Sequence, residues 1–128
     1  MRQPPALKPV IWVGSSLEDL RGFPSGAQDK IGTALQEVQY GFRPASIKTL
    51  SGFHGASILE IKADYDGDTY RGVYTVRFAE AIYVLHTFQN KSRHGSQTTK
   101  QDIELIQTRL KRAEVMHQEW IAAYQETL

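Results

Sequence analysis

Hydrophobic residues recur along the chain first at strand spacing, then at helical spacing, and then at strand spacing again. The β-branched and aromatic run at residues 10–13 predicts a short strand, which Gly14 ends. Apolar residues then repeat at helical intervals as far as Val38, with polar residues between them, and predict a helical hairpin over residues 15–41. Gly41 suits the left-handed backbone that follows the end of many helices.

Each helix of this hairpin is expected to begin with a capping box, in which two side chains bond free amide groups of the first turn. Ser15 stands three positions before Glu18 in the first box. Ser25 stands three positions before Gln28 in the second. Because Pro24 separates the two boxes and interrupts the helical pattern, two helices are predicted.

Three further strands are predicted after a connecting loop. The loop covers residues 42–56, where periodicity is weak, and it carries three apolar residues expected to pack on the core: Ile47, Leu50 and Phe53. Alternating patterns predict the strands at 57–63, 69–78 and 82–89. The Asp66-Gly67 pair is a hairpin signal, so these strands are expected to form an antiparallel meander.

A final helix is predicted from Thr98 or Thr99, with apolar residues at helical spacing up to Met116. Residues 117–128 are expected to extend this helix or to form a tail, and residues 1–8 to form a frayed arm. The predicted order is β-α-α-β-β-β-α over a single domain of residues 1–128. The fold class is α+β, with the helices on one face of a small, mainly antiparallel sheet.

Composition excludes several classes of protein. The chain has no cysteine, which excludes disulfides, thiolate metal clusters and a cysteine nucleophile. It shows no apolar run of membrane-spanning length and no signal peptide, so a cytoplasmic protein that does not enter the membrane is expected. No two histidines have the spacing of a helical metal pair, and no metal is predicted.

The net charge of +1 conceals an uneven distribution. Residues 69–112 contain eight lysines and arginines against three acids, a net charge of +5, and the rest of the chain carries −4. Strand alternation places Arg71 and Arg77 on the sheet face opposite the expected helices, and Lys62 of the neighbouring strand joins them. Arginines fixed on an open sheet face predict an anion site.

Several motifs occur in an order that resembles the RelE/HigB-like toxins of type II toxin–antitoxin systems, in their phage-derived, HigB-like branch. The motifs are the segments at 8–16, 48–53, 59–62, 67–71, 73–78 and 83–89, followed by a basic C-terminal helix. This resemblance implies a RelE-like fold and an endoribonuclease, or mRNA interferase, that cleaves messenger RNA on the 70S ribosome. It also implies a helix-turn-helix, HigA-like antitoxin as partner, and it implies no cofactor.

The resemblance also implies which residues perform the cleavage. Arg71 matches the arginine at the scissile phosphate, and Lys62 matches a basic position on the preceding strand. Lys91 and Arg93 match the basic cluster after the last strand, although Asn90 replaces one lysine that relatives carry there. Tyr74 also matches the family pattern, but alternation places it on the core side. The expected RNA contacts are Lys48, Arg77, Arg109 and Arg112.

The 2′-hydroxyl of RNA is itself a nucleophile, so the protein needs only to bind the phosphate and move protons. Lys62 or Lys91 is a candidate proton carrier, and His94 or His86 is an alternative. Two other functions remain open. One is inhibition of DNA gyrase, as in the related ParE toxins, and the other is a non-catalytic module that binds RNA or an acidic protein.

Overall fold

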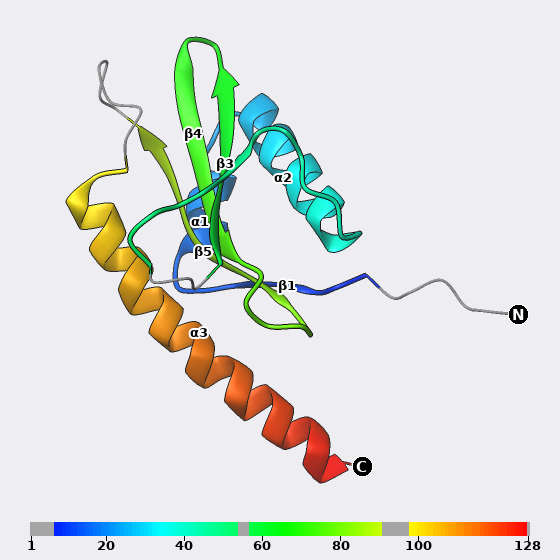
Figure 1. The fold of residues 1–128 in the computed structure, drawn as a ribbon. Helices are drawn as coiled ribbons and strands as arrows, with labels where there is room; N and C mark the ends of the chain where they lie inside the picture. The colour runs from blue at the N-terminus through cyan, green and yellow to red at the C-terminus, as the bar shows by residue number, and fades with distance from the viewer. Residues whose placement is uncertain (1–6, 54–56, 91–97, 128) are drawn as a thin grey trace, which may run out of the picture.

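The computed structural model describes residues 7–53, 57–90 and 98–127 of the chain. It contains a five-stranded sheet with helices on both faces (Figure 1). The elements in chain order are β1 (Val10–Trp12), α1 (Ser16–Arg21), α2 (Ser25–Gln39), β2 (Ile47–Thr49), β3 (Ile58–Tyr65), β4 (Asp68–Thr75), β5 (Ile82–Asn90) and α3 (Lys100–Thr127). None of the described helices combines the length and apolar character needed to cross a bilayer.

The sheet has the strand order β1-β5-β4-β3-β2. β3, β4 and β5 form the predicted antiparallel meander, and β1 pairs in parallel with the first part of β5. The β3–β4 hairpin turns at Asp66 and Gly67, whose φ angles are 51° and 84°. Two successive positive φ angles define a type I′ turn, which matches the twist of the strands and explains the Asp-Gly signal.

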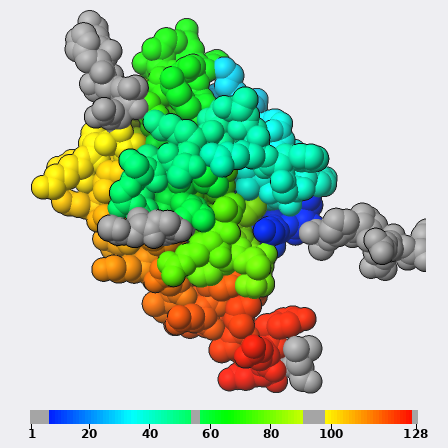
Figure 2. Space-filling view, in the orientation of Figure 1, coloured from blue at the N-terminus to red at the C-terminus, as the bar shows by residue number. Residues whose placement is uncertain are grey.

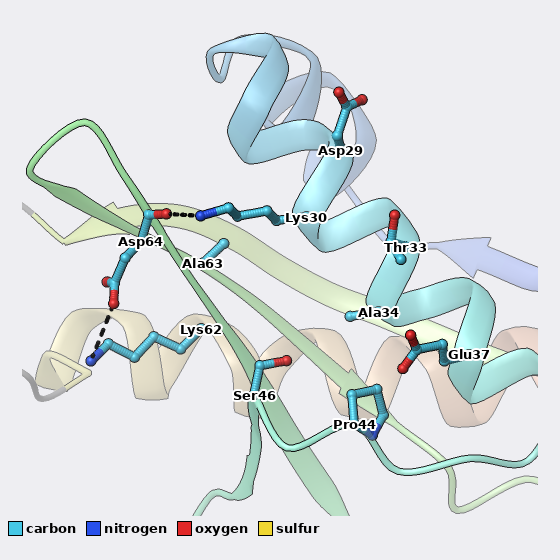
Figure 3. Close-up of a pocket in the computed structure, with 10 residues that line it drawn as sticks. All are labelled: Asp29, Lys30, Thr33, Ala34, Glu37, Pro44, Ser46, Lys62, Ala63 and Asp64. Atoms are coloured by element: carbon cyan, nitrogen blue, oxygen red, sulfur yellow. Dashed lines mark hydrogen bonds and ion pairs between the residues drawn. The ribbon is translucent and has the colours of Figure 1, made fainter.

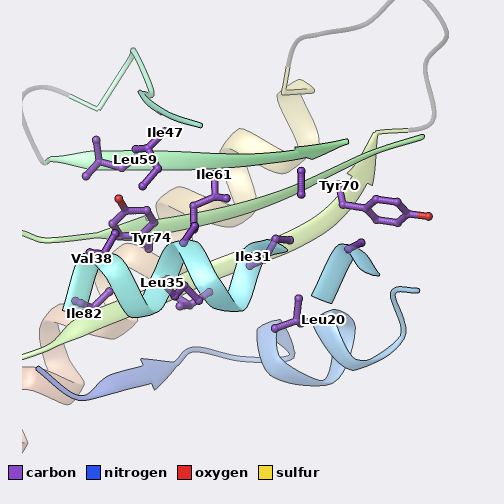
Figure 4. Packing of buried hydrophobic residues seen from close by; sticks show 14 residues of the cluster. Leu20, Ile31, Leu35, Val38, Ile47, Leu59, Ile61, Tyr70, Tyr74 and Ile82 are labelled. Atoms are coloured by element: carbon purple, nitrogen blue, oxygen red, sulfur yellow. The ribbon is translucent and has the colours of Figure 1, made fainter. Parts of the chain in front are cut away.

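The helices cover both faces of the sheet, and the prediction that they share one face is wrong. α1 and α2 pack on a first core that includes Ile31, Leu35, Ile61 and Tyr74 (Figure 4). α3 packs on the opposite face, in a second core that includes Ile58, Val73, Leu85, Ile106 and Leu110. The physical reason is that the central strands present apolar side chains on both faces, and each face must be covered.

The largest differences from the predicted strands are the presence of β2 and the earlier end of β4. The connecting loop contains β2, whose Ile47 packs in the first core while Lys48 and Thr49 are exposed. β4 ends at Thr75 and not at Phe78. Its partner β3 begins at Ile58, opposite Thr75. Beyond this pair the Val76 backbone N–H still donates to the Ser57 carbonyl at 3.4 Å, and the next N–H, that of Arg77, donates to the Thr75 hydroxyl at 3.1 Å.

Neither predicted capping box forms. Ser15 is the N-cap of α1, but its hydroxyl donates to the Asp19 carboxylate at 2.8 Å. α2 begins at Ser25 with Pro24 as its N-cap, and the Gln28 side chain donates to the Phe23 carbonyl at 2.8 Å. The predicted left-handed residue after α2 is confirmed, because Gly41 has a φ of 90°.

α3 continues as far as Thr127, through the region where the sequence predicts a helix extension or a tail. Its N-cap is Thr99, whose hydroxyl accepts the Asp102 backbone N–H at 3.2 Å. The last turns of α3 project beyond the rest of the molecule (Figure 2), and they expose Trp120 and Tyr124. The helix is therefore longer than the sheet face that it covers.

Candidate functional site

A buried ion pair joins β3 and β4 at the centre of the candidate site. Arg71 Nη1 donates a hydrogen bond to Glu60 Oε1. The Arg71 side chain is 1% exposed and the Glu60 side chain is 0% exposed. Both residues point to the sheet face that α3 covers, which also carries Ile58 and Val73. The predicted face of Arg71 is therefore right, but the expectation of an open face is wrong, since α3 packs on it.

Side chains from two other segments also contact the Glu60 carboxylate. The Thr98 hydroxyl, just before α3, donates to Glu60 Oε2 at 2.8 Å. Lys48 Nζ of β2 lies 3.8 Å from Glu60 Oε1, and the Lys48 side chain is half exposed. One carboxylate thus receives contacts from β2, from β4 and from the start of α3. These contacts stabilise its negative charge inside the protein.

Sequence reasoning did not single out Glu60 as a candidate site residue. A signal was present, because Glu60 is a charged residue inside a strand and its two neighbours, Leu59 and Ile61, are apolar. Such a side chain is either exposed on one face of the sheet or paired in the interior. Sequence alone did not distinguish these cases, because the partner, Arg71, belongs to another strand.

Lys62 is the register partner of Arg71, so the two residues lie on the same face of the sheet, as strand alternation predicts. Its ammonium group, however, lies 3.9 Å from the carboxylate of Asp64 (Figure 3). Lys62 and Asp64 line an open cavity of about 510 Å³ at the outer edge of β3, together with Lys30 and Glu37 of α2. Lys62 is thus exposed beside the buried pair, and its ammonium group is directed toward the Asp64 carboxylate.

Arg77 and Arg109 are expected to contact RNA, but both make contacts within the protein. Arg77 lies beyond the end of β4 and pairs with Glu114 of α3. Arg109 donates to the Leu85 carbonyl and to the Ser15 hydroxyl, at 2.9 Å each. Leu85 is the bulged residue of β5, since Val73 pairs with His86 and Tyr74 pairs with Val84. Arg109 therefore satisfies a carbonyl at an irregular point of the sheet.

Burial lowers the pKa of the Arg109 guanidinium, and the nearby Asp19 carboxylate opposes this shift. Arg112 lies exposed on the same helix. Lys91, Arg93 and His94 lie outside the described residues, so their expected place beside Arg71 stays a prediction.

His86 of β5 makes a further polar contact on the sheet face that α3 covers. Its Nε2 lies 2.8 Å from Asp102 Oδ1 of α3, and its ring stacks on Phe88. Tyr74 lies in the core on the other face, as alternation predicted, and burial raises its pKa to about 12. A phenol with this pKa stays protonated at neutral pH. Tyr74 therefore fills the core and does not transfer protons at the Glu60–Arg71 pair.

The described residues contain no group of three or more acidic or histidine side chains arranged to hold a metal ion. The Glu60–Arg71 pair supplies a carboxylate and a planar guanidinium side by side. Such a pair can bind a phosphate through the guanidinium and accept a proton at the carboxylate.

Comparisons with known proteins bear on the family and on the fold of the chain. The family model described as Phage derived protein Gp49-like (DUF891) matches residues 18–111. None of the curated proteins matches the chain. Among solved structures, a mutant of the E. coli toxin RelE in the free state matches with a TM-score of 0.57 and 18% sequence identity, over 84% of this chain and 98% of that chain. The chain therefore has a RelE-like fold.

Proposed function

Because the chain belongs to the Gp49-like family of phage-derived proteins, a family of RelE/HigB-like toxins, we propose that it is the toxin of a type II toxin–antitoxin system. Its proposed activity is the metal-independent cleavage of messenger RNA on the translating ribosome. The observation that supports this activity best is the Glu60–Arg71 pair, because it joins a phosphate-binding group to a proton acceptor.

The proposed reaction uses the 2′-hydroxyl of RNA as nucleophile. Arg71 binds the phosphate and stabilises the charge that develops on it. Glu60 accepts the proton of the 2′-hydroxyl while the 2′-oxygen bonds to phosphorus. The bond from phosphorus to the 5′-oxygen then breaks, and a cationic side chain supplies a proton to that oxygen. The products are a 2′,3′-cyclic phosphate and a 5′-hydroxyl.

Several candidates remain for the proton donor and for further phosphate contacts. Lys62 and Lys48 are exposed near the buried pair. Lys91, Arg93 and His94 keep the roles that the family resemblance implies, as proposals. Exposed cations around a buried pair suit a site that meets RNA from the surface.

The burial of Arg71 supports the proposal that RNA cleavage depends on the ribosome. The Arg71 side chain is 1% exposed, so a phosphate reaches it only after groups around it move. An enzyme whose arginine is covered in the free protein is expected to cleave free RNA poorly. Binding to the ribosome would supply the interactions that open the site.

We further propose that the partner is a helix-turn-helix, HigA-like antitoxin, and that the toxin acts in the cytoplasm, where it meets ribosomes. Induction of the chain in bacteria, followed by primer extension on a translated messenger, tests the activity. We expect growth arrest with cleaved messenger for the wild type and intact messenger for Arg71→Ala. Equal cleavage by both proteins would exclude Arg71 as the phosphate ligand.

A second candidate function is favoured by the same burial of Arg71. A completely buried Arg–Glu pair is also a structural feature that fixes the packing of a core. A non-catalytic module that binds RNA or an acidic protein would then give neither growth arrest nor cleavage. A gyrase inhibitor of the ParE type would give arrest with intact messenger and DNA damage, so one induction experiment separates the three functions.

A further inference from the structure

An open pocket of about 620 Å³ lies beside the part of β5 that extends past β1. β1 pairs only with Ile82–Val84 of β5. Beyond this point α1 packs beside β5, where the Thr87 hydroxyl donates to the Ser16 carbonyl at 2.7 Å. The pocket is lined by side chains from α1, the turn after it and β5, among them Glu18, Asp19, Phe23, His86, Phe88 and Gln89.

One wall of this pocket is a supported aromatic ring. The rings of His86 and Phe88 stack with centroids 4.5 Å apart and an interplanar angle of 16°. Asp102 of α3 holds His86 at 2.8 Å, and His86 in turn supports one side of the Phe88 ring. Phe88 is only partly buried. A fixed, accessible aromatic ring binds the flat face of a nucleobase with little loss of conformational freedom.

The rim of the pocket carries hydrogen-bond acceptors. Asp19 already accepts a hydrogen bond from the Ser15 hydroxyl, whereas Glu18 is exposed on the same turn of α1. Guanine presents an imino N–H and an amino group side by side, which match the two oxygens of one carboxylate. Uracil presents carbonyls on both sides of its single N–H, and a carboxylate repels them. Gln89 adds an amide that can donate to the guanine carbonyl.

The pocket is adjacent to the proposed phosphate site. Phe88 is the register partner of Arg71 in the β4–β5 pair. A nucleotide whose base enters the pocket therefore brings its phosphate to the Arg71 end of the sheet. We propose that this pocket binds one base of the RNA substrate and prefers guanine, with Phe88 as the stacking residue and Glu18 as the residue that selects the base. This inference rests on the proposed RNA-cleaving function.

The test is a titration of the purified protein with guanosine 5′-monophosphate and with uridine 5′-monophosphate, followed by NMR. We expect the guanosine nucleotide to bind at least about 5-fold more tightly, because two extra donor–acceptor contacts form. Glu18→Gln should remove this preference, and Phe88→Leu should weaken both nucleotides about 5-fold or more through loss of stacking. Glu37→Gln, on α2 and beside the other cavity, is the matched control and should bind as the wild type does.

Equal binding of the two nucleotides by the wild type would overturn the inference, and so would an unchanged preference in Glu18→Gln. Because Glu18 is exposed, this variant decides the question even where Phe88→Leu does not fold. The proposed function fails separately: a wild type that prefers guanosine nucleotide at this pocket but leaves translated messenger intact supports the base site and excludes the cleavage. A wild type that cleaves translated messenger but binds the two nucleotides equally would support the cleavage and exclude the base site.

Discussion

The carboxylate of Glu60 and the guanidinium of Arg71 hydrogen-bond to each other between β3 and β4, and both side chains are buried. Removing one charge of such a pair leaves the other charge buried without its partner, which costs about 3–5 kcal/mol. We therefore expect Glu60→Gln to lower the free energy of unfolding by about 3 kcal/mol in urea denaturation.

The matched control is Glu114→Gln, which removes the carboxylate from the exposed pair with Arg77. Exposed ion pairs contribute about 0–1 kcal/mol, so this variant should unfold almost as the wild type does. The double variant Glu60→Leu with Arg71→Met should lose less stability than Glu60→Leu alone, since no charge stays buried. Equal losses in Glu60→Gln and Glu114→Gln would contradict a tightly coupled buried pair.

Lys48 and Arg77 should differ in their effect on RNA cleavage. Lys48 lies 3.8 Å from Glu60, whereas Arg77 pairs with Glu114 beyond the end of β4. We expect Lys48→Ala to slow cleavage about tenfold, which corresponds to about 1.4 kcal/mol of lost transition-state stabilisation. Arg77→Ala should cleave as the wild type does. Primer extension in a translating extract measures both rates, and a larger loss in the Arg77 variant would reverse the assignment.

Arg109 should be important for stability. Its two hydrogen bonds reach the carbonyl of the bulged Leu85 and the Ser15 hydroxyl. Hydrogen bonds to a charged group contribute about 1.5–3 kcal/mol, so Arg109→Met should lower the free energy of unfolding by about 2 kcal/mol. Arg112→Met removes an exposed arginine of the same helix and should change the free energy of unfolding by less than about 0.5 kcal/mol. Similar urea midpoints for the two variants would show that the Arg109 contacts are weak.

Tyr74 gives a pH-dependent contribution to stability. Burial raises its pKa from 10.0 to about 12, so the folded state holds the phenol proton more tightly than the unfolded state does. Between these values the folded protein binds more protons, and stability must fall as pH rises from about 10 to about 12. Below the unfolded pKa this contribution is fully present.

Between pH 9 and pH 12, Tyr74→Phe should therefore lose less stability than the wild type loses. The difference between the two proteins should correspond to the titration of about one group. Tyr40→Phe, which removes an exposed hydroxyl, should leave the pH dependence unchanged. Urea unfolding at intervals of half a pH unit compares the three proteins. Parallel curves for the wild type and Tyr74→Phe would mean that Tyr74 ionises equally in both states.

Local sequence signals predicted most of the fold because they act over a few residues. The Asp66-Gly67 turn requires two positive φ angles, and the chain supplies residues that adopt them. Helical spacing over Ser25–Gln39 similarly specifies one apolar face of α2. β2 was missed because its three residues bury one side chain, Ile47, which is too short a pattern to distinguish a strand from a loop.

The sequence by itself determined the order of every element except β2, and the face of the sheet on which Arg71 of β4 lies. Only the tertiary structure decided that α3 covers the face on which Arg71 lies, that Glu60 is its partner, and that Thr98 and Lys48 meet the same carboxylate. The physical reason is that these contacts join residues far apart in the chain. Strand alternation states which face a side chain occupies, but the packing of other elements decides what covers that face.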